Sequence, residues 1–497
     1  MGGGPIALNP LLSQFNDVDK DLVSLLFSGL TALDARGDVI PSLAESWEVQ
    51  DDGRTYLFRL RDDVQWHDGV PLVADDVVHT VRTLQDPAYT GFPDLAELWR
   101  QFAIEKVDER TVRFRLRTAF APFLAYATLG VLPSHRLAGV AAGRLADSDF
   151  NTNPIGTGPF RFEEGSAGYV ELSANPLYFR GSPFLSRFRL RFFHDEMAAL
   201  AALEREEVLG VLLRPPAATA VAPRLKRSNR WQVLDMARPS TVMLFLNQSR
   251  PPFQEAAVRK AVSLALDRTA IVRLGAGGQG VPARGPLVPG TWVDRSALPE
   301  MVHDPALAGR VLDEAGWRRG TDGMRERADQ RLSFTIITDN DPRRVSVMEE
   351  AVRELRDVGI DVKPSAAGFT GLIQDFLIPR RFQAVIYGLD NGYDPDAYPV
   401  WHSSQIKEDG FNFASLADRQ IDDVLERARV ESDRAGRADL YRDFATLFIE
   451  KMPSVPLYHP LYTYVLDPRV RQVQPSVLFE PASRFLNVHE WYLRPKQ

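Results

Sequence analysis

The chain has 497 residues, 44% of them hydrophobic, and a formal net charge of −7. This length allows about two to four domains with sizeable cores. The absence of cysteine excludes thiol catalysis, disulfides and cysteine-ligated metals. No block rich in lysine and arginine appears, which argues against nucleic acid as a partner.

The sequence contains no apolar run that approaches the roughly 18 residues of a membrane span. Its start, MGGGPIALNP, has neither the basic nor the apolar region of a signal peptide. The chain is therefore either cytosolic or a form from which an export segment has been removed.

The first 162 residues alternate helices with half-buried strands. An amphipathic helix is expected over residues 19–29, and a second one carries Val77, Val81 and Leu84 on one face and ends at Pro87. Strict alternation predicts strands over 55–60 and 111–117. The Gly/Pro cluster NPIGTGPFRF, residues 153–162, indicates a tight connection and a candidate domain boundary.

The remaining elements predict an α/β arrangement. One long helix is expected over 254–274, and another begins at an Asp304 cap and ends before Gly316. Residues 332–387 follow a β-α-β-α-β order, which implies a mostly parallel sheet with helices packed on it. Two further amphipathic helices are expected near 419–431 and 436–451.

The stretch RLGAGGQGVPARG, residues 273–285, contains a G-x-G-x-x-G pattern. A dinucleotide site needs a strand before these glycines and a helix after them. Here a helix comes before, and Pro282, Pro286 and Pro289 forbid a regular helix after. We therefore expect no dinucleotide here, only a tight and irregular connector.

No catalytic or metal-binding constellation is visible. The eight histidines are scattered without H-x-x-x-H spacing, and there is no G-x-S-x-G elbow or Walker A loop. We expect no catalytic residues, no cofactor and no metal site, and we expect that the protein is not an enzyme. A hydrolase is kept as a remote alternative.

The segment YGLDNGYDPDAYPVWHSSQ, residues 387–405, follows a predicted strand and combines carboxylates with aromatic side chains. Ligands of open α/β sheets bind just beyond strand carboxyl ends, so this loop is a candidate site for a cationic or polar organic ligand. A surface loop with buried aromatic residues would show the same composition.

Several motifs in order carry a resemblance to a known family. They are IPSLAESWEVQDDGRTYLFRLRDDVQWHDGVPLVADDVVHTV, GTGPFRF, VRKAVSLALDR, HDPALAGRVLDEAGW, DPDAYPVWHSS and MPSVPLYH. The chain resembles the extracellular solute-binding proteins of ABC importers, family 5, which includes dipeptide-, oligopeptide- and nickel-binding proteins. The resemblance covers nearly the whole length.

This resemblance implies an α/β, periplasmic-binding-protein-like two-lobed clamp of type II, cluster C, with an extra domain. Lobe 1 would comprise 1–40, 155–238 and 466–497, the extra domain 41–154, and lobe 2 239–465. The lobes would close on a ligand by hinge motion.

The implied function is capture of a di- or oligopeptide as the substrate-binding component of an ABC importer. The peptide would lie extended between the lobes, and a carboxylate before the Asp394-Pro395 pair would hold its α-amine. The family position falls on Asn391, whereas Asp390 lies one residue early. The expected ligand-binding residues are Asp390, Asn391, Tyr387, Trp401, Thr241, Phe15, Asn16 and Asp17. Two alternatives stay open. Trp401 could be a core residue, and the solute could be a non-peptide: an oligosaccharide, a metal chelate or an opine-like compound.

The resemblance also implies partners and a location. The partners are the solute and the permease subunits with their ATPase, and the chain is expected to be a monomer. The family works outside the cytoplasmic membrane, which favours the view that an export or anchoring segment has been removed from this chain.

Overall fold

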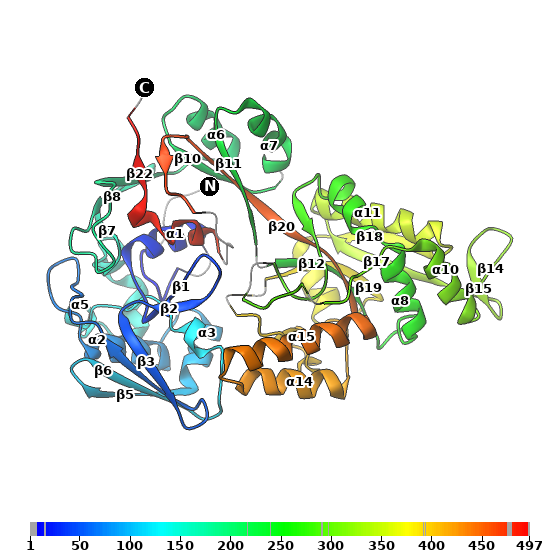
Figure 1. Ribbon diagram of the computed structural model, residues 1–497, viewed down its shortest axis with the longest axis horizontal. Helices are drawn as coiled ribbons and strands as arrows, with labels where there is room; N and C mark the ends of the chain where they lie inside the picture. The colour runs from blue at the N-terminus through cyan, green and yellow to red at the C-terminus, as the bar shows by residue number, and fades with distance from the viewer. Residues whose placement is uncertain are drawn as a thin grey trace.

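Two groups of secondary-structure elements lie side by side and are joined by one long strand in the computed structural model (Figure 1). We refer to residues 7–238 and 467–495 as the first lobe and to residues 240–453 as the second lobe. The structure describes residues 7–13, 16–215, 217–238, 240–289, 292–296, 298–390, 392, 394–474 and 480–495.

The described part of the first lobe contains four small antiparallel sheets, with strand orders β1-β2, β3-β4-β6-β5, β7-β8-β9 and β21-β22. Its strands are β1 (Thr31–Leu33), β2 (Val39–Pro41), β3 (Ala44–Gln50), β4 (Thr55–Leu60), β5 (Phe102–Asp108), β6 (Thr111–Leu116), β7 (Phe160–Gly165), β8 (Tyr169–Ala174), β9 (Arg187–Arg191), β10 (Gly210–Leu213), β11 (Gln232–Ala237), β21 (Val470–Arg471) and β22 (Tyr492–Leu493). Its main helices are α1 (Asp17–Leu26), α2 (Ala74–Gln85), α3 (Pro93–Arg100), α4 (Phe123–Tyr126), α5 (Ser134–Leu137), α6 (Glu196–Glu204) and α7 (Ala217–Ser228). The strands and helices predicted up to residue 117 are thereby confirmed, with α1 ending three residues before Gly29.

Two of the sequence motifs meet at the end of α1. The imidazole of His67 accepts a hydrogen bond at Nδ1 from the Gly156 amide (3.1 Å), and its Nε2 lies 3.2 Å from the Gly158 carbonyl oxygen. A Cβ at Gly156 would lie 1.8 Å from the Leu26 carbonyl oxygen, and one at Gly158 would lie 2.5 Å from that of Leu25. Only glycine allows this close approach, so the GTG segment fixes the helix end against the strand that follows.

The second lobe is built on a mixed sheet with the order β10-β20-β12-β19-β17-β18. Its own strands are β12 (Ser240–Leu246), β13 (Gly280–Pro282), β14 (Arg318–Arg319), β15 (Arg325–Arg327), β16 (Gln330–Arg331), β17 (Ser333–Asp339), β18 (Asp361–Ala367) and β19 (Ala384–Asp390), and β20 (Ser454–Leu466) connects the two lobes. Its helices are α8 (Ala256–Ala265), α9 (Arg268–Ala270), η3 (Ile271–Gly275), α10 (Pro305–Glu314), α11 (Pro342–Asp357), α12 (Phe369–Gly371), η4 (Leu372–Leu377), α13 (Tyr398–Trp401), α14 (Arg419–Val430) and α15 (Arg434–Lys451).

Strand β12 is buried on both faces, which explains its uninterrupted apolar run from Val242 to Leu246. Val242 and Leu244 pack into the core beneath α8, α10 and α11. Met243 and Phe245 point to the opposite core, which contains α14 and α15. This central strand therefore separates two helical layers.

Two sequence predictions for this lobe need correction. The helix expected over 254–274 is interrupted after Ala265, because Asp267 caps a new helix through bonds from the Thr269 and Ala270 amides. The segment 332–387 has the predicted parallel strands β17, β18 and β19, but β12 pairs with β19 in antiparallel orientation, and β20 pairs with β12 in antiparallel orientation. The complete sheet is therefore mixed, not mostly parallel.

The glycine-rich stretch is a tight connector between η3 and β13, as predicted. Gly277 and Gly278 have φ angles of +61° and +76°. A Cβ at Gly275 would lie 2.8 Å from the Cα of Val347, so this glycine lets η3 approach α11 closely. The first and third glycines of the pattern serve packing and pairing, and no helix opens on them.

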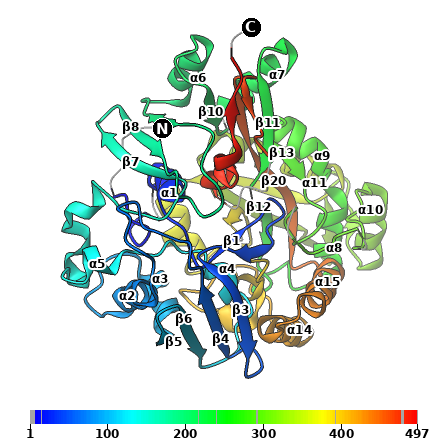
Figure 2. The ribbon, with the colours of Figure 1, turned by 60° about the vertical axis from the view of Figure 1, so that its left-hand side comes forward.

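Strand β20 belongs to both lobes (Figures 1 and 2). Its residues from Leu461 to Leu466 pair with β10 and β11, and its residues from Ser454 to Tyr458 pair with β12. The lobes are thereby connected through continuous backbone hydrogen bonding. The predicted domain boundaries stay a prediction.

We expect a pH-dependent loss of stability from His67. Desolvation at this half-buried position lowers its pKa to about 4. Between pH 6.5 and 4 the unfolded chain therefore binds a proton that the folded chain does not. The free energy of unfolding should fall across this window as the pH decreases, by up to about 3 kcal/mol from this residue.

The measurement is urea unfolding at pH 7.5 and 5.0 for the wild type, His67→Gln and the control His194→Gln. The His194 side chain is 82% exposed. The His67 variant should be less stable at pH 7.5 and should lose less stability on acidification. Equal pH dependence in all three proteins would contradict this assignment.

Candidate functional site

A cavity of about 410 Å³ lies between the two lobes. The first lobe contributes the end of α4, and the second lobe contributes the residues after β13, the end of β19 and α13. The lining residues are Ala125, Tyr126, Pro286, Leu287, Val288, Leu389, Asp390, Gly392, Asp394, Pro395, Asp396, Ala397, Pro399, Val400, Trp401 and Phe411. Its walls are mainly apolar, and every ionisable group among these residues other than Tyr126 is a carboxylate.

The helical hairpin of α14 and α15 contacts the first lobe beside this cavity. The Ala121 amide donates to the Arg429 carbonyl oxygen at 2.8 Å. The Arg429 guanidinium lies 5.6 Å from the Phe120 ring centroid, and Arg434 forms an ion pair with Asp38. The lobes are therefore in direct contact at one edge of the site.

Two of the three carboxylates in the cavity wall are neutralised internally. Asp394 forms a bidentate ion pair with Arg437 at 2.5 and 2.6 Å, and both side chains are almost fully buried. Asp396 accepts bonds from Arg429 at 2.8 and 2.9 Å. Burial raises the pKa of Asp394, and Arg437 opposes this shift. These two carboxylates hold the loop on α14 and α15.

The third carboxylate, Asp390, is different because its side chain is 65% exposed. It accepts bonds from a single guanidinium nitrogen of Arg238, at 2.9 and 3.1 Å. Asp390 is the last residue of β19 and lies opposite Ser240 of β12. Its carboxylate is therefore accessible from the cavity at the point where the chain enters the second lobe.

The structure brings Asp17 and Asp390 into the neighbourhood of the same tyrosine. Burial raises the pKa of Tyr462, Arg238 lowers it, and both aspartates raise it. The Asp17 carboxylate accepts a bond from Arg214 at 2.8 Å, and Asn16 caps α1 through the Val18 amide. Phe15 and Asn391, also predicted for the site, lie outside the described residues.

Three predicted site residues are enclosed by protein. Thr241 is fully buried, and its hydroxyl lies 3.2 Å from Nδ1 of His459. Tyr387 is half-buried, with its ring in edge contact with Phe413. Trp401 is 3% exposed and packs on Phe245 and Phe448, yet it forms part of the cavity wall. In this conformation Thr241 and Tyr387 do not line the cavity.

Sequence reasoning missed several residues of the site. Tyr126 comes from the region predicted as the extra domain, and Leu287 and Val288 follow the glycine-rich stretch. Arg238 lies two residues before the start of β12. None of these residues belongs to a recognisable motif. Only Tyr126 is distinctive in the structure, because it is a large aromatic side chain on a short helix that is exposed to solvent.

Among the described residues, no helix has the length and apolarity to cross a membrane. In the same part of the chain, no group of three or more His, Cys, Asp or Glu side chains is arranged to hold a metal ion.

Comparisons with known proteins agree on one family. Residues 38–410 match the model of the bacterial extracellular solute-binding proteins, family 5. The oligopeptide-binding protein AppA of Bacillus subtilis is 30% identical over 99% of this chain and 90% of its own sequence. The structure of AppA in complex with a nonapeptide superposes with a TM-score of 0.71 at 28% identity, covering 100% of this chain and 98% of AppA. NikZ of Campylobacter jejuni in complex with Ni(L-His) has a TM-score of 0.74 at 26% identity, with 99% and 98% covered. The predicted family and the two-lobed fold are confirmed.

We expect the neutralised and the exposed carboxylates to differ in stability tests. Arg437→Met leaves Asp394 buried without its partner and should lower the free energy of unfolding by about 3–5 kcal/mol. Asp390→Asn removes an exposed ion pair and should cost less than about 1 kcal/mol. Urea unfolding at pH 7.5 measures both. Similar losses in the two variants would contradict a structural role for the Asp394–Arg437 pair.

Proposed function

The chain belongs to family 5 of the bacterial extracellular solute-binding proteins, and we propose that it is the substrate-binding component of an ABC importer. It captures a di- or oligopeptide between its lobes and delivers it to permease subunits that work with an ATPase. It acts as a monomer outside the cytoplasmic membrane. As a binding protein, it has no catalytic residues.

The observation that carries this proposal is the inter-lobe cavity with Asp390 in its wall. Asp394 and Asp396 are largely buried against their arginines, whereas Asp390 is exposed beside Arg238, so Asp390 is the carboxylate of the described cavity lining that a ligand cation can reach. A peptide α-ammonium matches it, because an ammonium donor strengthens a hydrogen bond to a carboxylate.

The remaining walls suit the rest of a peptide. Leu287, Val288 and Val400 offer apolar surface opposite Tyr126. Such a pocket takes up an apolar side chain, while one polar group fixes its orientation. The AppA complex with a nonapeptide supports a peptide as ligand. We therefore propose a peptide with an apolar side chain close to its free amino terminus.

Arg238 is an internal competitor for the amine in this proposal. Its guanidinium bonds to the same carboxylate that the ligand would use, and its side chain is 34% exposed. It also lies 5.1 Å from the Tyr462 ring centroid, which offers an alternative cation–π position. The ligand amine would replace Arg238 at Asp390 when the lobes close.

The non-peptide alternative rests on NikZ, whose structure holds Ni(L-His) on a similar fold. A metal chelate, an oligosaccharide or an opine-like compound would serve the same transport role. The exposed carboxylate beside apolar walls favours the peptide.

Native mass spectrometry of the purified chain tests the class of solute. Clamp-type proteins retain ligands, so we expect a series of bound masses that fragments as peptides with free amino termini. The same measurement on protein refolded from urea, then incubated with a peptide mixture, controls for carry-over. A single sugar or metal complex as the retained species would contradict the peptide proposal.

We expect Asp390→Asn to weaken binding of a peptide with a free amine by at least about tenfold, because a charge-assisted bond is lost. The affinity for the same peptide with an acetylated amino terminus should not change. Isothermal titration calorimetry measures both affinities. The matched control is Asp423→Asn, an exposed aspartate on α14.

The variant Arg238→Gln shows whether Arg238 competes with the ligand amine for Asp390 or holds the ligand itself. If Arg238 competes with the amine, its removal should tighten binding about two- to fivefold, in line with the small contribution of an exposed ion pair. Weaker binding in this variant would show that Arg238 holds the ligand itself. Unchanged affinity in Asp390→Asn would remove the amine site from Asp390.

A further inference from the structure

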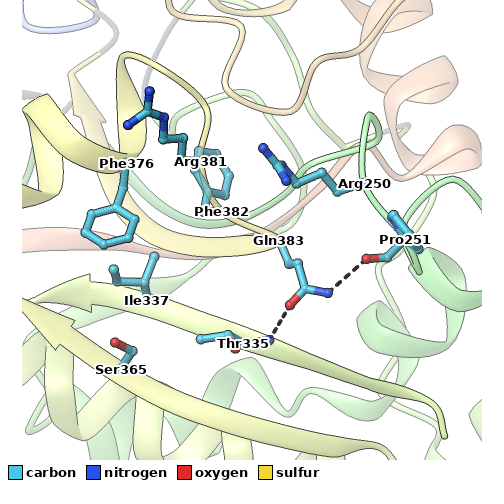
Figure 3. Close-up of a pocket in the computed structure, with 9 residues that line it drawn as sticks. All are labelled: Arg250, Pro251, Thr335, Ile337, Ser365, Phe376, Arg381, Phe382 and Gln383. Atoms are coloured by element: carbon cyan, nitrogen blue, oxygen red, sulfur yellow. Dashed lines mark hydrogen bonds between the residues drawn. The ribbon is translucent and has the colours of Figure 1, made fainter.

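A second pocket, of about 420 Å³, lies within the second lobe (Figure 3). Its floor comes from β17 and β18, and its rim comes from η4 and the segments before β19 and α8. The lining residues are Arg250, Pro251, Thr335, Ile337, Ser365, Phe376, Arg381, Phe382 and Gln383.

This pocket is separate from the inter-lobe cavity, since the two share no lining residue. Strand β19 begins at Ala384, next to the second pocket, and ends at Asp390 in the cavity. A strand of this length spans about 20 Å. A ligand here would therefore not reach the proposed amine site.

The charge of the pocket is unlike that of the whole chain. Arg250 and Arg381 are exposed, and within the described residues neither guanidinium has an ion pair or a side-chain hydrogen bond. Lys363 lies beside Thr335 in the sheet register and is exposed as well. The pocket lining contains no carboxylate, although the chain carries a net charge of −7. This local excess of positive charge favours an anion.

Some neutral polar groups of the pocket already form hydrogen bonds within the protein, and others are available to a ligand. The Gln383 amide is held by two bonds, accepting from the Thr335 amide at 3.0 Å and donating to the Pro251 carbonyl oxygen at 3.0 Å (Figure 3). In the described part of the chain, the hydroxyls of Thr335 and Ser365 have no partner. Gln383 thus fixes the wall, and the hydroxyls remain as donors.

The other walls are apolar. Ile337 and Phe382 are buried, and Phe376 is half-buried beside them. Figure 3 shows Phe376 above Ile337 on the strand side, with Arg250 and Arg381 on the loop side. A ligand that fills this pocket therefore needs both a charged and an apolar end.

We propose that this pocket is a second ligand site for a small amphipathic oxyanion, either a carboxylate or a phosphate monoester with a compact apolar body. Arg250 and Arg381 hold the oxyanion by charge-assisted hydrogen bonds. The apolar body packs on Ile337 and Phe376. The site is independent of the solute that the inter-lobe cavity takes.

The test is ligand-detected NMR titration of the full chain with phenyl phosphate and, separately, with benzoate. We expect saturable binding of at least one probe that weakens with added salt. Inorganic phosphate has the oxyanion without the apolar ring, and phenol has the ring without the oxyanion. Each should bind at least about tenfold more weakly. The preferred head group is given by the comparison of the two probes.

Two variants make the assignment specific. The double substitution Arg250→Gln/Arg381→Gln should lower the affinity for the better probe at least about tenfold. Arg310→Gln on α10, another exposed arginine, should leave it unchanged. No saturable binding of either probe, or equal affinity in the double variant and the wild type, would overturn the proposal.

Discussion

Strand β20 is the constraint on which the rest of the structure depends. Its two halves form hydrogen-bonded ladders with strands of different lobes, so neither lobe can shift along the strand without breaking backbone bonds. The pairing therefore opposes a sliding of the two lobes along the strand.

The position of Asp390 follows from this arrangement. Strand β19 is held against β12, and the register places Asp390 opposite Ser240, where the chain enters the second lobe. Its partner Arg238 lies two residues before Ser240 in sequence. An exchange of Arg238 for a ligand at this carboxylate would therefore take place at the connection between the lobes. Ligand binding and the relative orientation of the lobes would be linked by one ion pair.

The sequence predicted the family, the two-lobed fold and most helices and strands, because these depend on local patterns and motif order. The predictions were wrong where a contact with a residue far away in the sequence overrides the local preference of the chain. The helix expected over 254–274 breaks at Asp267, whose amide donates to Glu354 on α11. The carboxylate-rich loop was correctly placed beyond a strand end. However, the pairing of Asp394 with Arg437, 43 residues away, could not be read from composition.

The family could be predicted from the motifs, whereas the ligand could not, because some motif residues hold the fold and do not line the cavity. The motif residues His67, Gly156 and Gly158 hold the end of α1 and form no part of the inter-lobe cavity. The cavity is lined by residues of the motif DPDAYPVWHSS, such as Asp394 and Trp401, and by residues between motifs, such as Tyr126 and Val288. One fold supports many functions, so the solute has to be inferred from the side chains of the site itself. AppA with a nonapeptide and NikZ with Ni(L-His) match this chain about equally well, at 28% and 26% identity. Overall similarity therefore does not distinguish a peptide from a chelate. The exposed carboxylate of Asp390 in the cavity wall, in contrast to the buried carboxylate of Asp394, is the better guide.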